Sequence, residues 1–193
     1  MGNIVILVGR SCSGKTTLAR YLEDYWGFER ILTATTRPQR PNEKSDSYLF
    51  LSERVFDYFE KEGAFLEVTS FPAGVPPWKY GSFKEDYVFS KDGRQEDRVV
   101  VLTPNGVYKA LDIPGMEKAL VVWIDPPEEV CLERAALRGD GFSEVRRRLE
   151  TDHETFEQYE HSCLYDIIFY QNETTEHMAE AIIKELEKRN AEQ

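Results

Sequence analysis

Cysteine is scarce in this sequence. Of its 193 residues only 3 are cysteines, Cys12, Cys131 and Cys163, and their wide separation does not suit a shared metal ion. An odd number of scattered cysteines also does not build the disulfide framework of a small secreted protein. We therefore expect free thiols in a reducing, cytoplasmic environment.

Basic residues and long hydrophobic runs are also few. The 24 Lys and Arg residues against 35 Asp and Glu residues give a net charge of −11. Nucleic acids and anionic membranes attract basic surfaces, so neither is expected as a partner. The first apolar run, Ile4–Val8, is too short for a signal peptide or a membrane span. These shortages indicate a soluble protein of one domain, and they leave open whether it is a monomer or a homodimer.

The clearest motif lies between Gly9 and Thr16 and reads Gly-Arg-Ser-Cys-Ser-Gly-Lys-Thr. It follows an apolar run and precedes a helical stretch, which is the strand, glycine-rich turn and helix of a phosphate-binding P-loop. Glycines let backbone amides face a polyphosphate, Lys15 can reach the outer phosphates, and Thr16 is placed to bind Mg²⁺. A glycine-rich turn that binds nothing is the weaker alternative. The residues expected to bind ATP are Gly9, Ser11, Cys12, Ser13, Gly14, Lys15, Thr16 and Thr17.

Short apolar segments alternate with helical patterns along most of the chain. Continuously apolar strands are typical of a parallel sheet covered on both faces. We therefore predict an α/β P-loop fold of three layers with a central parallel sheet. Its strands are expected at about 3–8, 28–33, 98–102, 119–124 and 164–170.

Residues 33–85 interrupt this alternation and predict an inserted β-rich lobe. Within it, Ser52 is expected to begin a helix whose inner face carries Val55, Phe56 and Phe59. A helical lid is expected over 139–148, so that the core comprises 1–32, 86–138 and 149–193. Further along, Asp125 precedes two prolines and a glutamate, a pattern that favours a helix N-cap over a metal-binding acid.

Two groups of arginines are candidates for binding phosphate, because the planar guanidinium suits a phosphate group. Arg37 and Arg40 lie three apart in a proline-stiffened loop. Arg134 and Arg138 lie four apart, on one face of a helix, and a second helix after a glycine-flanked turn carries 146–148. The helices predict either a mobile lid over phosphates or a hairpin with solvated arginines, and composition does not separate the two.

Taken in order, these residues resemble the guanylate kinase family, the P-loop enzymes that phosphorylate GMP from ATP. The resemblance spans nearly the whole chain. Besides the P-loop it rests on Thr35-Thr36-Arg37, Arg40, Glu43, Tyr48, Phe50, Phe65-Leu66-Glu67, Tyr80-Gly81-Ser82, Pro126-Pro127, the lid arginines and Tyr165-Asp166.

The resemblance implies a role for each candidate residue. The guanine base would be bound by Thr33, Glu67 and Ser82, because a carboxylate accepts both N1–H and the 2-amino group while a hydroxyl donates to O6. The residues expected to bind the acceptor as a whole are Thr33, Arg37, Arg40, Tyr48, Glu67, Tyr80, Ser82 and Thr103. Those expected to stabilise the transferred phosphoryl group are Lys15, Arg37, Arg134, Arg138 and Arg148, with Mg²⁺ on Thr16.

The chain departs from the family pattern in several places. A strand that ends Leu-Asp-Ile-Asp in the family reads Val100-Val101-Leu102-Thr103 here, so both acids are gone. Arg10-Ser11-Cys12 replaces a usual Pro-Ser-Gly, the loop 71–78 is longer, and the lid turn is shorter. The lost acids leave two alternatives: a kinase of this fold with another phosphorylated acceptor, such as a different nucleoside monophosphate or a ribose bisphosphate, or a catalytically weak binding module.

Overall fold

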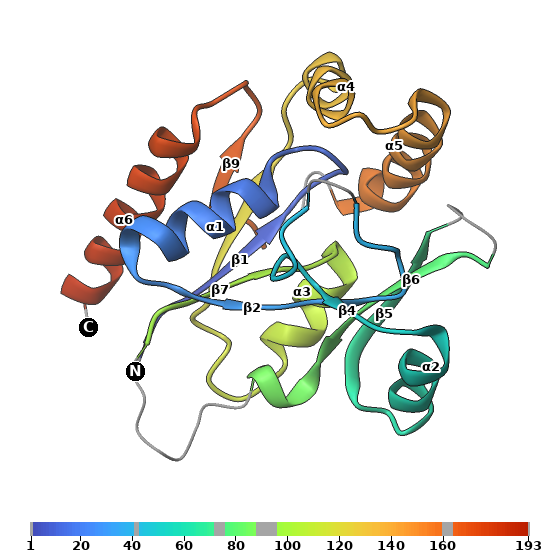
Figure 1. Cartoon of the computed structure of the whole chain (residues 1–193). Coiled ribbons are helices and arrows are strands. Elements are labelled where there is room, and N and C mark those ends of the chain that lie inside the picture. Colours follow the sequence, from blue (N-terminus) through green and yellow to red (C-terminus); the bar gives the residue numbers. More distant parts are fainter. Residues whose placement is uncertain (1, 41–42, 72–75, 88–95, 160–163, 193) are drawn as a thin grey trace.

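A five-stranded parallel sheet forms the centre of the computed structural model, which describes residues 2–40, 43–71, 76–87, 96–159 and 164–192 (Figure 1). The strand order is β2-β7-β1-β8-β9, and every neighbouring pair is parallel. All five residues of the central strand are buried, as expected for a strand covered on both faces. The strands are β1 (Ile4–Val8), β2 (Glu29–Ile31), β7 (Arg98–Val101), β8 (Leu120–Ile124) and β9 (Ile167–Phe169).

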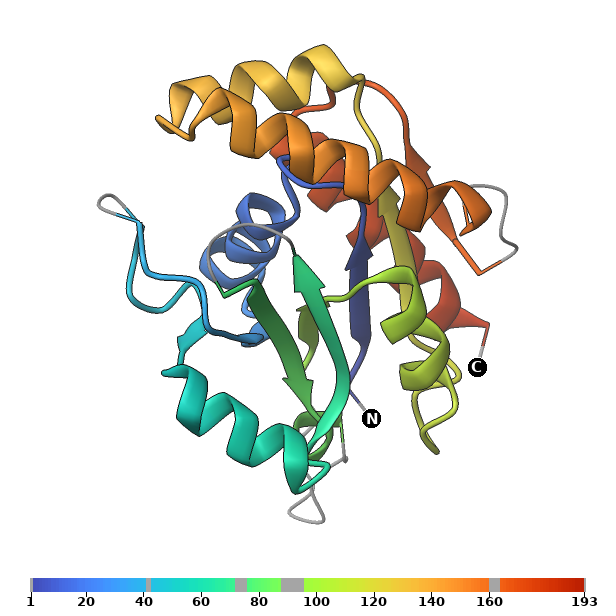
Figure 2. The ribbon, with the colours of Figure 1, turned by 90° about the vertical axis from the view of Figure 1, so that its right-hand side faces the viewer.

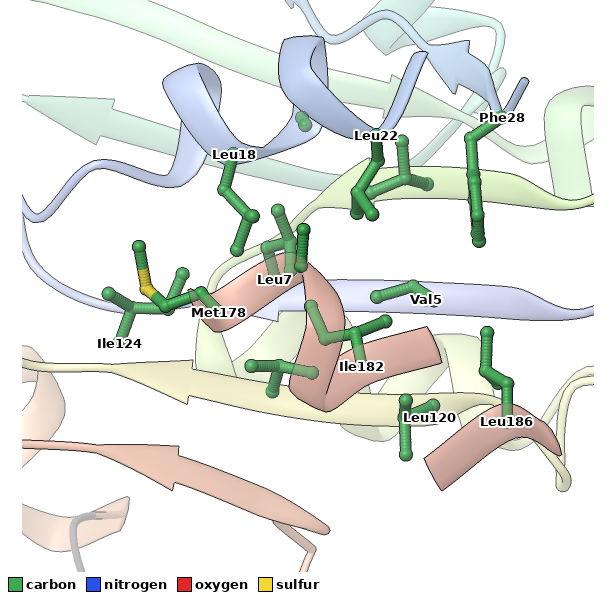
Figure 3. Packing of buried hydrophobic residues seen from close by; sticks show 14 of the residues in the cluster. Val5, Leu7, Leu18, Leu22, Phe28, Leu120, Ile124, Met178, Ile182 and Leu186 are labelled. Atoms are coloured by element: carbon green, nitrogen blue, oxygen red, sulfur yellow. The ribbon is translucent and has the colours of Figure 1, made fainter. Parts of the chain in front are cut away.

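Helices α1 (Lys15–Trp26) and α6 (Thr175–Ala191) cover one face of this sheet. Figure 3 shows their side chains meeting over the sheet, where the labelled residues are Val5, Leu7, Leu18, Leu22, Phe28, Leu120, Ile124, Met178, Ile182 and Leu186. Helix α1 ends at Gly27, whose φ of 72° lies in the left-handed region, as the sequence predicted.

The opposite face is covered by α3 (Pro104–Leu111) and by the end of α5 (Phe142–Phe156). Trp123 of β8 is fully buried there and lies 5.5 Å from Phe156, measured between ring centroids. The two faces and the sheet make three layers, so the predicted α/β fold with a central parallel sheet is confirmed.

A second sheet of four strands lies beside the central one, in the order β4-β3-β6-β5. Its elements are β3 (Ala34–Thr35), β4 (Leu49–Phe50), α2 (Glu53–Lys61), β5 (Phe65–Phe71) and β6 (Trp78–Phe83). Its core is small: Phe56 of α2 stacks on Phe65 with 4.6 Å between ring centroids, next to Ala34. The prediction that Val55 faces inward was wrong, because it is 41% exposed and Phe56 is the buried residue of this helix.

Helices α4 (Glu128–Leu137) and α5 form an antiparallel pair joined by a short turn that contains Gly139 and Gly141. They pack through Cys131, Ala135, Val145 and Leu149. Figure 2 shows the pair above the carboxyl ends of the central strands, facing the second sheet across the P-loop. This is the arrangement that places the lid arginines over the loop.

Cys12 and Cys131 are free thiols, as predicted, while Cys163 and residues 72–75 of the long loop lie outside the described residues. Within the described ranges, no helix combines the length and the apolar character needed to cross a bilayer.

Candidate active site

A cleft of about 1250 Å³ opens where the ends of β1 and β7, the second sheet and the α4–α5 pair meet. Ligands of open α/β sheets bind at the carboxyl ends of parallel strands, which is where this cleft lies. All the residues predicted for the site line it except Ser13 and Ser82, whose exposed fractions are 0% and 1%. The candidate residues predicted from the sequence therefore lie together at one site.

The P-loop has the backbone that its glycines predict. Gly9 and Gly14 have φ values of 151° and 107°, and Cys12 is a non-glycine residue at φ 65°. A Cβ atom on Gly9 would lie 2.0 Å from the carbonyl oxygen of Ile124 at the end of β8. The first glycine is thus required by a close backbone approach as well as by its torsion angle.

Replacing Gly9 with alanine is expected to destabilise the fold by about 3 kcal/mol, because the added methyl group meets rigid backbone. Urea unfolding followed by circular dichroism measures this effect. Gly141, which has open space around its Cα atom, is the matched control, since alanine there meets nothing within 4 Å. Equal stability of the two variants would contradict the packing argument.

The ammonium group of Lys15 folds back onto the loop. Its Nζ donates to the carbonyl oxygen of Arg10 at 2.6 Å and to Ser13 Oγ at 3.3 Å. Desolvation in the loop lowers the pKa of Lys15, and the nearby Asp152 carboxylate acts in the opposite direction. The lysine is held at the edge of the cleft without a direct carboxylate partner among the described residues.

Two arginines at the end of α4 contact the P-loop. Arg134 donates to the carbonyl oxygen of Ser13 at 2.5 Å and to Asn172 at 2.9 Å. Arg138 lies 2.8 Å from Asp140 and 2.7 Å from the sulfur of Cys12. In the described part of the chain, Nη1 of Arg148 is buried without a hydrogen-bond partner. Arg134 and Arg138 thus contact the P-loop, whereas Arg146 and Arg147 are exposed, so the pair combines loop-binding and solvated arginines.

Two arginines of the second sheet's loop face the cleft from the other side. Arg37 is only 2% exposed, is paired with Glu43 at 2.6 Å, and lies over the rings of Tyr48 and Phe50 at 5.3 and 5.6 Å. Arg40 pairs with Asp140 of the lid turn at 2.9 Å. Its Nη2 is buried and, among the described residues, has no hydrogen-bond acceptor.

Glu67 and Ser82 lie directly opposite each other on the antiparallel strands β5 and β6. Both are buried, at 7% and 1% exposure, and the hydroxyl of Ser82 has no hydrogen-bond partner among the described residues. Burial raises the pKa of Glu67, while hydrogen bonds from Thr103 lower it. A carboxylate that lines the cleft thus has a buried hydroxyl opposite it on the neighbouring strand.

Comparison with known proteins agrees with this geometry. The sequence model of the guanylate kinase family matches residues 1–188. The chain belongs to the guanylate kinase family. The guanylate kinase of Mycobacterium leprae is 32% identical over 161 residues, covering 78% of this chain and 71% of the relative. That of Coxiella burnetii is 29% identical over 161 residues, covering 81% and 75%.

A solved guanylate kinase structure, from Anaplasma phagocytophilum, shares the fold. It superposes with a TM-score of 0.64 at 22% identity, covering 97% of this chain and 86% of that one. At this identity the likeness concerns the fold alone.

Arg10, which departs from the guanylate kinase pattern, forms an ion pair with Asp125. Its Nε lies 2.5 Å from the carboxylate, and its Nη2 donates to the carbonyl oxygen of Pro126 at 3.1 Å. The prediction that Asp125 caps a helix was wrong, because the N-cap position of α4 is Pro127 and no side chain bonds to it. The unusual charge in the loop and the acid at the end of β8 neutralise each other.

Two acids that sequence reasoning missed complete the site. Asp152 is 2% exposed and accepts a hydrogen bond from the amide of Ser11 in the P-loop at 2.5 Å. Asp140, with a 4% exposed side chain, lies between Arg40 and Arg138. Asp152 follows Arg148 by four residues, the spacing of one helix face, and this spacing is the signal that could have found it.

Proposed function

We propose that this member of the guanylate kinase family transfers the γ-phosphoryl group of ATP to the phosphate of GMP or dGMP. One observation carries the proposal: a single cleft has the P-loop on one side and Glu67 on the other, with Ser82 directly opposite Glu67 on the neighbouring strand. The first suits a polyphosphate and the second suits guanine.

Guanine presents two donors, N1–H and the 2-amino group, and one acceptor, O6. The Glu67 carboxylate would accept from both donors, and the hydroxyl of Ser82 would donate to O6. Adenine lacks the donor pair and would leave a buried carboxylate unsatisfied, which is costly. Thr33, which also lines the cleft, would contribute to the same recognition.

The acceptor phosphate would be bound by Arg37, Arg40, Tyr48 and Tyr80. Arg37 is preorganised by Glu43 and by the ring of Tyr48, so little ordering remains when an anion binds. Buried donors without a partner are rare in folded proteins. The unpartnered Nη2 of Arg40 supports an anion in this place.

On the ATP side, the loop amides and Lys15 would hold the phosphates, with Arg134, Arg138 and Arg148 above them. The acceptor phosphate is already anionic, so the reaction needs positioning and charge neutralisation rather than a general base. The lid arginines also exclude water from the transferred group.

Enzymes of this kind generally need a divalent metal ion. Within the described residues, no group of three or more His, Cys, Asp or Glu side chains could hold one by itself. Thr16, which lines the cleft next to Lys15, fits the alternative in which one protein hydroxyl and the nucleotide's phosphates supply hard oxygen ligands. Magnesium bound there would neutralise charge on the phosphates of ATP.

Release of ADP from Mg·ATP tests the proposal, with GMP, dGMP, AMP, CMP and UMP compared as acceptors. A signal with the guanine nucleotides that exceeds the others by at least about a hundredfold is expected. A larger signal with another nucleotide or with a ribose bisphosphate would refute the guanine assignment. No signal with any acceptor, from protein that still binds ATP, would favour a binding module.

A further inference from the structure

We propose that Thr103 is the positioning residue that sets the purine preference of this enzyme: it holds the Glu67 carboxylate in the orientation that accepts both donors of guanine. Thr103 lies two residues after the end of β7 and at the N-cap of α3, where the family pattern has an acid. This inference rests on the proposed phosphorylation of GMP and names the residue that makes it selective.

Thr103 supplies one donor to each oxygen of the carboxylate. Its amide donates to Oε1 of Glu67 at 3.3 Å, and its hydroxyl donates to Oε2. A carboxylate oxygen accepts up to two hydrogen bonds, so each oxygen keeps one acceptor site for a ligand. The two remaining acceptor sites match the two donors of guanine, N1–H and the 2-amino group.

The direction of the hydroxyl proton is fixed by α3. The amide of Gly106, which can only donate, bonds to Oγ1 of Thr103 at 3.1 Å. This bond is the N-cap of the helix, so the hydroxyl accepts from the helix and directs its single proton to Glu67. One side chain therefore begins α3 and orients the carboxylate.

Gly106 shows how closely the carboxylate packs against the helix. A Cβ atom at this position would lie 2.4 Å from the carboxyl carbon and from Oε1 of Glu67. The first turn of a helix carries partial positive charge on its free amides, which favours an anion there. This close packing holds the Glu67 carboxylate in one position.

The surroundings of Glu67 leave Thr103 as its nearest stabilising group. Burial raises the pKa of Glu67, and against this act the two Thr103 bonds and, more weakly, the charge of Lys109 on α3. Tyr87, on the 3₁₀ helix Lys84–Tyr87, also faces the carboxylate, but burial raises its own pKa and keeps it neutral. Ser82 of β6 is uncharged. Removing the Thr103 hydroxyl should therefore raise the pKa of Glu67 further.

The experiment compares the full-length wild-type protein with Thr103→Val, which has nearly the same shape without the hydroxyl. The efficiency kcat/KM is measured with GMP, with IMP, which lacks the 2-amino group, and with AMP. The pKa of Glu67 is measured separately by NMR titration of the ¹³C-labelled carboxyl group in the absence of nucleotides. The valine variant is expected to lose about ten- to a hundredfold in kcat/KM for GMP with no loss for AMP.

In the valine variant, the pKa of Glu67 should rise by about one pH unit or more. The acid limb of the pH profile for GMP should move to higher pH with it. Thr103→Ser should restore both properties, because it keeps the hydroxyl. Thr103→Gly retains most of the capping preference without the hydroxyl, and it serves if the valine variant does not fold. The matched control is Thr174→Val, since Thr174 caps α6 in the same way and is not among the residues that line the cleft.

The control should lower the melting temperature without altering the ratio of GMP to AMP efficiency. If the wild type phosphorylates GMP while the Thr103→Val and Thr103→Gly variants keep its ratio of GMP to AMP efficiency and its Glu67 pKa, this inference alone is overturned. A wild type that does not phosphorylate GMP would overturn the proposed function, and the guanine preference argued here with it.

Discussion

Replacing Lys15 with alanine is expected to slow phosphoryl transfer by about a thousandfold while leaving the fold intact. Among the described residues, the ammonium group bonds only to the Arg10 carbonyl oxygen and Ser13 within its own loop, so no hydrogen bond to the core is lost. What is lost is the mobile positive charge that neutralises the outer phosphates in the transition state. ADP release at saturating GMP measures the rate of transfer, and a thermal unfolding curve measures the stability of the fold.

Lys184, exposed on α6, provides the matched control, and its replacement with alanine should change neither the rate nor the unfolding curve. Turnover of the Lys15 variant within about tenfold of wild type would exclude the P-loop from the mechanism.

Replacing Glu67 with glutamine is expected to reduce the ratio of GMP to AMP efficiency by at least about a hundredfold. The glutamine side chain presents one acceptor and one donor, whereas guanine needs two acceptors. One donor of the base therefore meets the NH₂ group of the glutamine. Adenine presents a donor and an acceptor along the same edge, and the amide can match it. Competition assays with both nucleotides and Mg·ATP give the ratio directly.

Glu53 of α2 is exposed and does not line the cleft, and glutamine there removes the same charge. That variant should keep the wild-type ratio. An unchanged ratio in the Glu67 variant would return this residue to a purely structural role in β5.

Much of the site could be predicted because its signals are local. The P-loop is contiguous, so its strand, turn and helix could be predicted from one stretch of sequence. Glu67 and Ser82 are 15 positions apart by their numbering, yet the resemblance linked them, and the β5–β6 register places them opposite each other. Local chemistry and strand pairing therefore specify both ends of the cleft.

What could not be predicted depends on contacts between distant parts of the chain. Ser11 and Asp152 are separated by 141 residues, and Arg10 and Asp125 by 115. Asp125 has the local context of a helix cap, but a charged partner at 2.5 Å decides its conformation instead. Local propensity is a weak guide where a long-range ion pair competes with it.

The Asp140 carboxylate, shared by Arg40 of the second sheet's loop and Arg138 of the lid, gives the cleft an anion of its own. If the acceptor phosphate binds at Arg40 as proposed, its arrival exchanges one anion for another rather than adding charge to a bare cationic surface. The Arg40 guanidinium would then have an anion beside it both before and after the acceptor binds. An acidic protein can in this way limit the uncompensated positive charge of a phosphate-binding cleft with a carboxylate of its own.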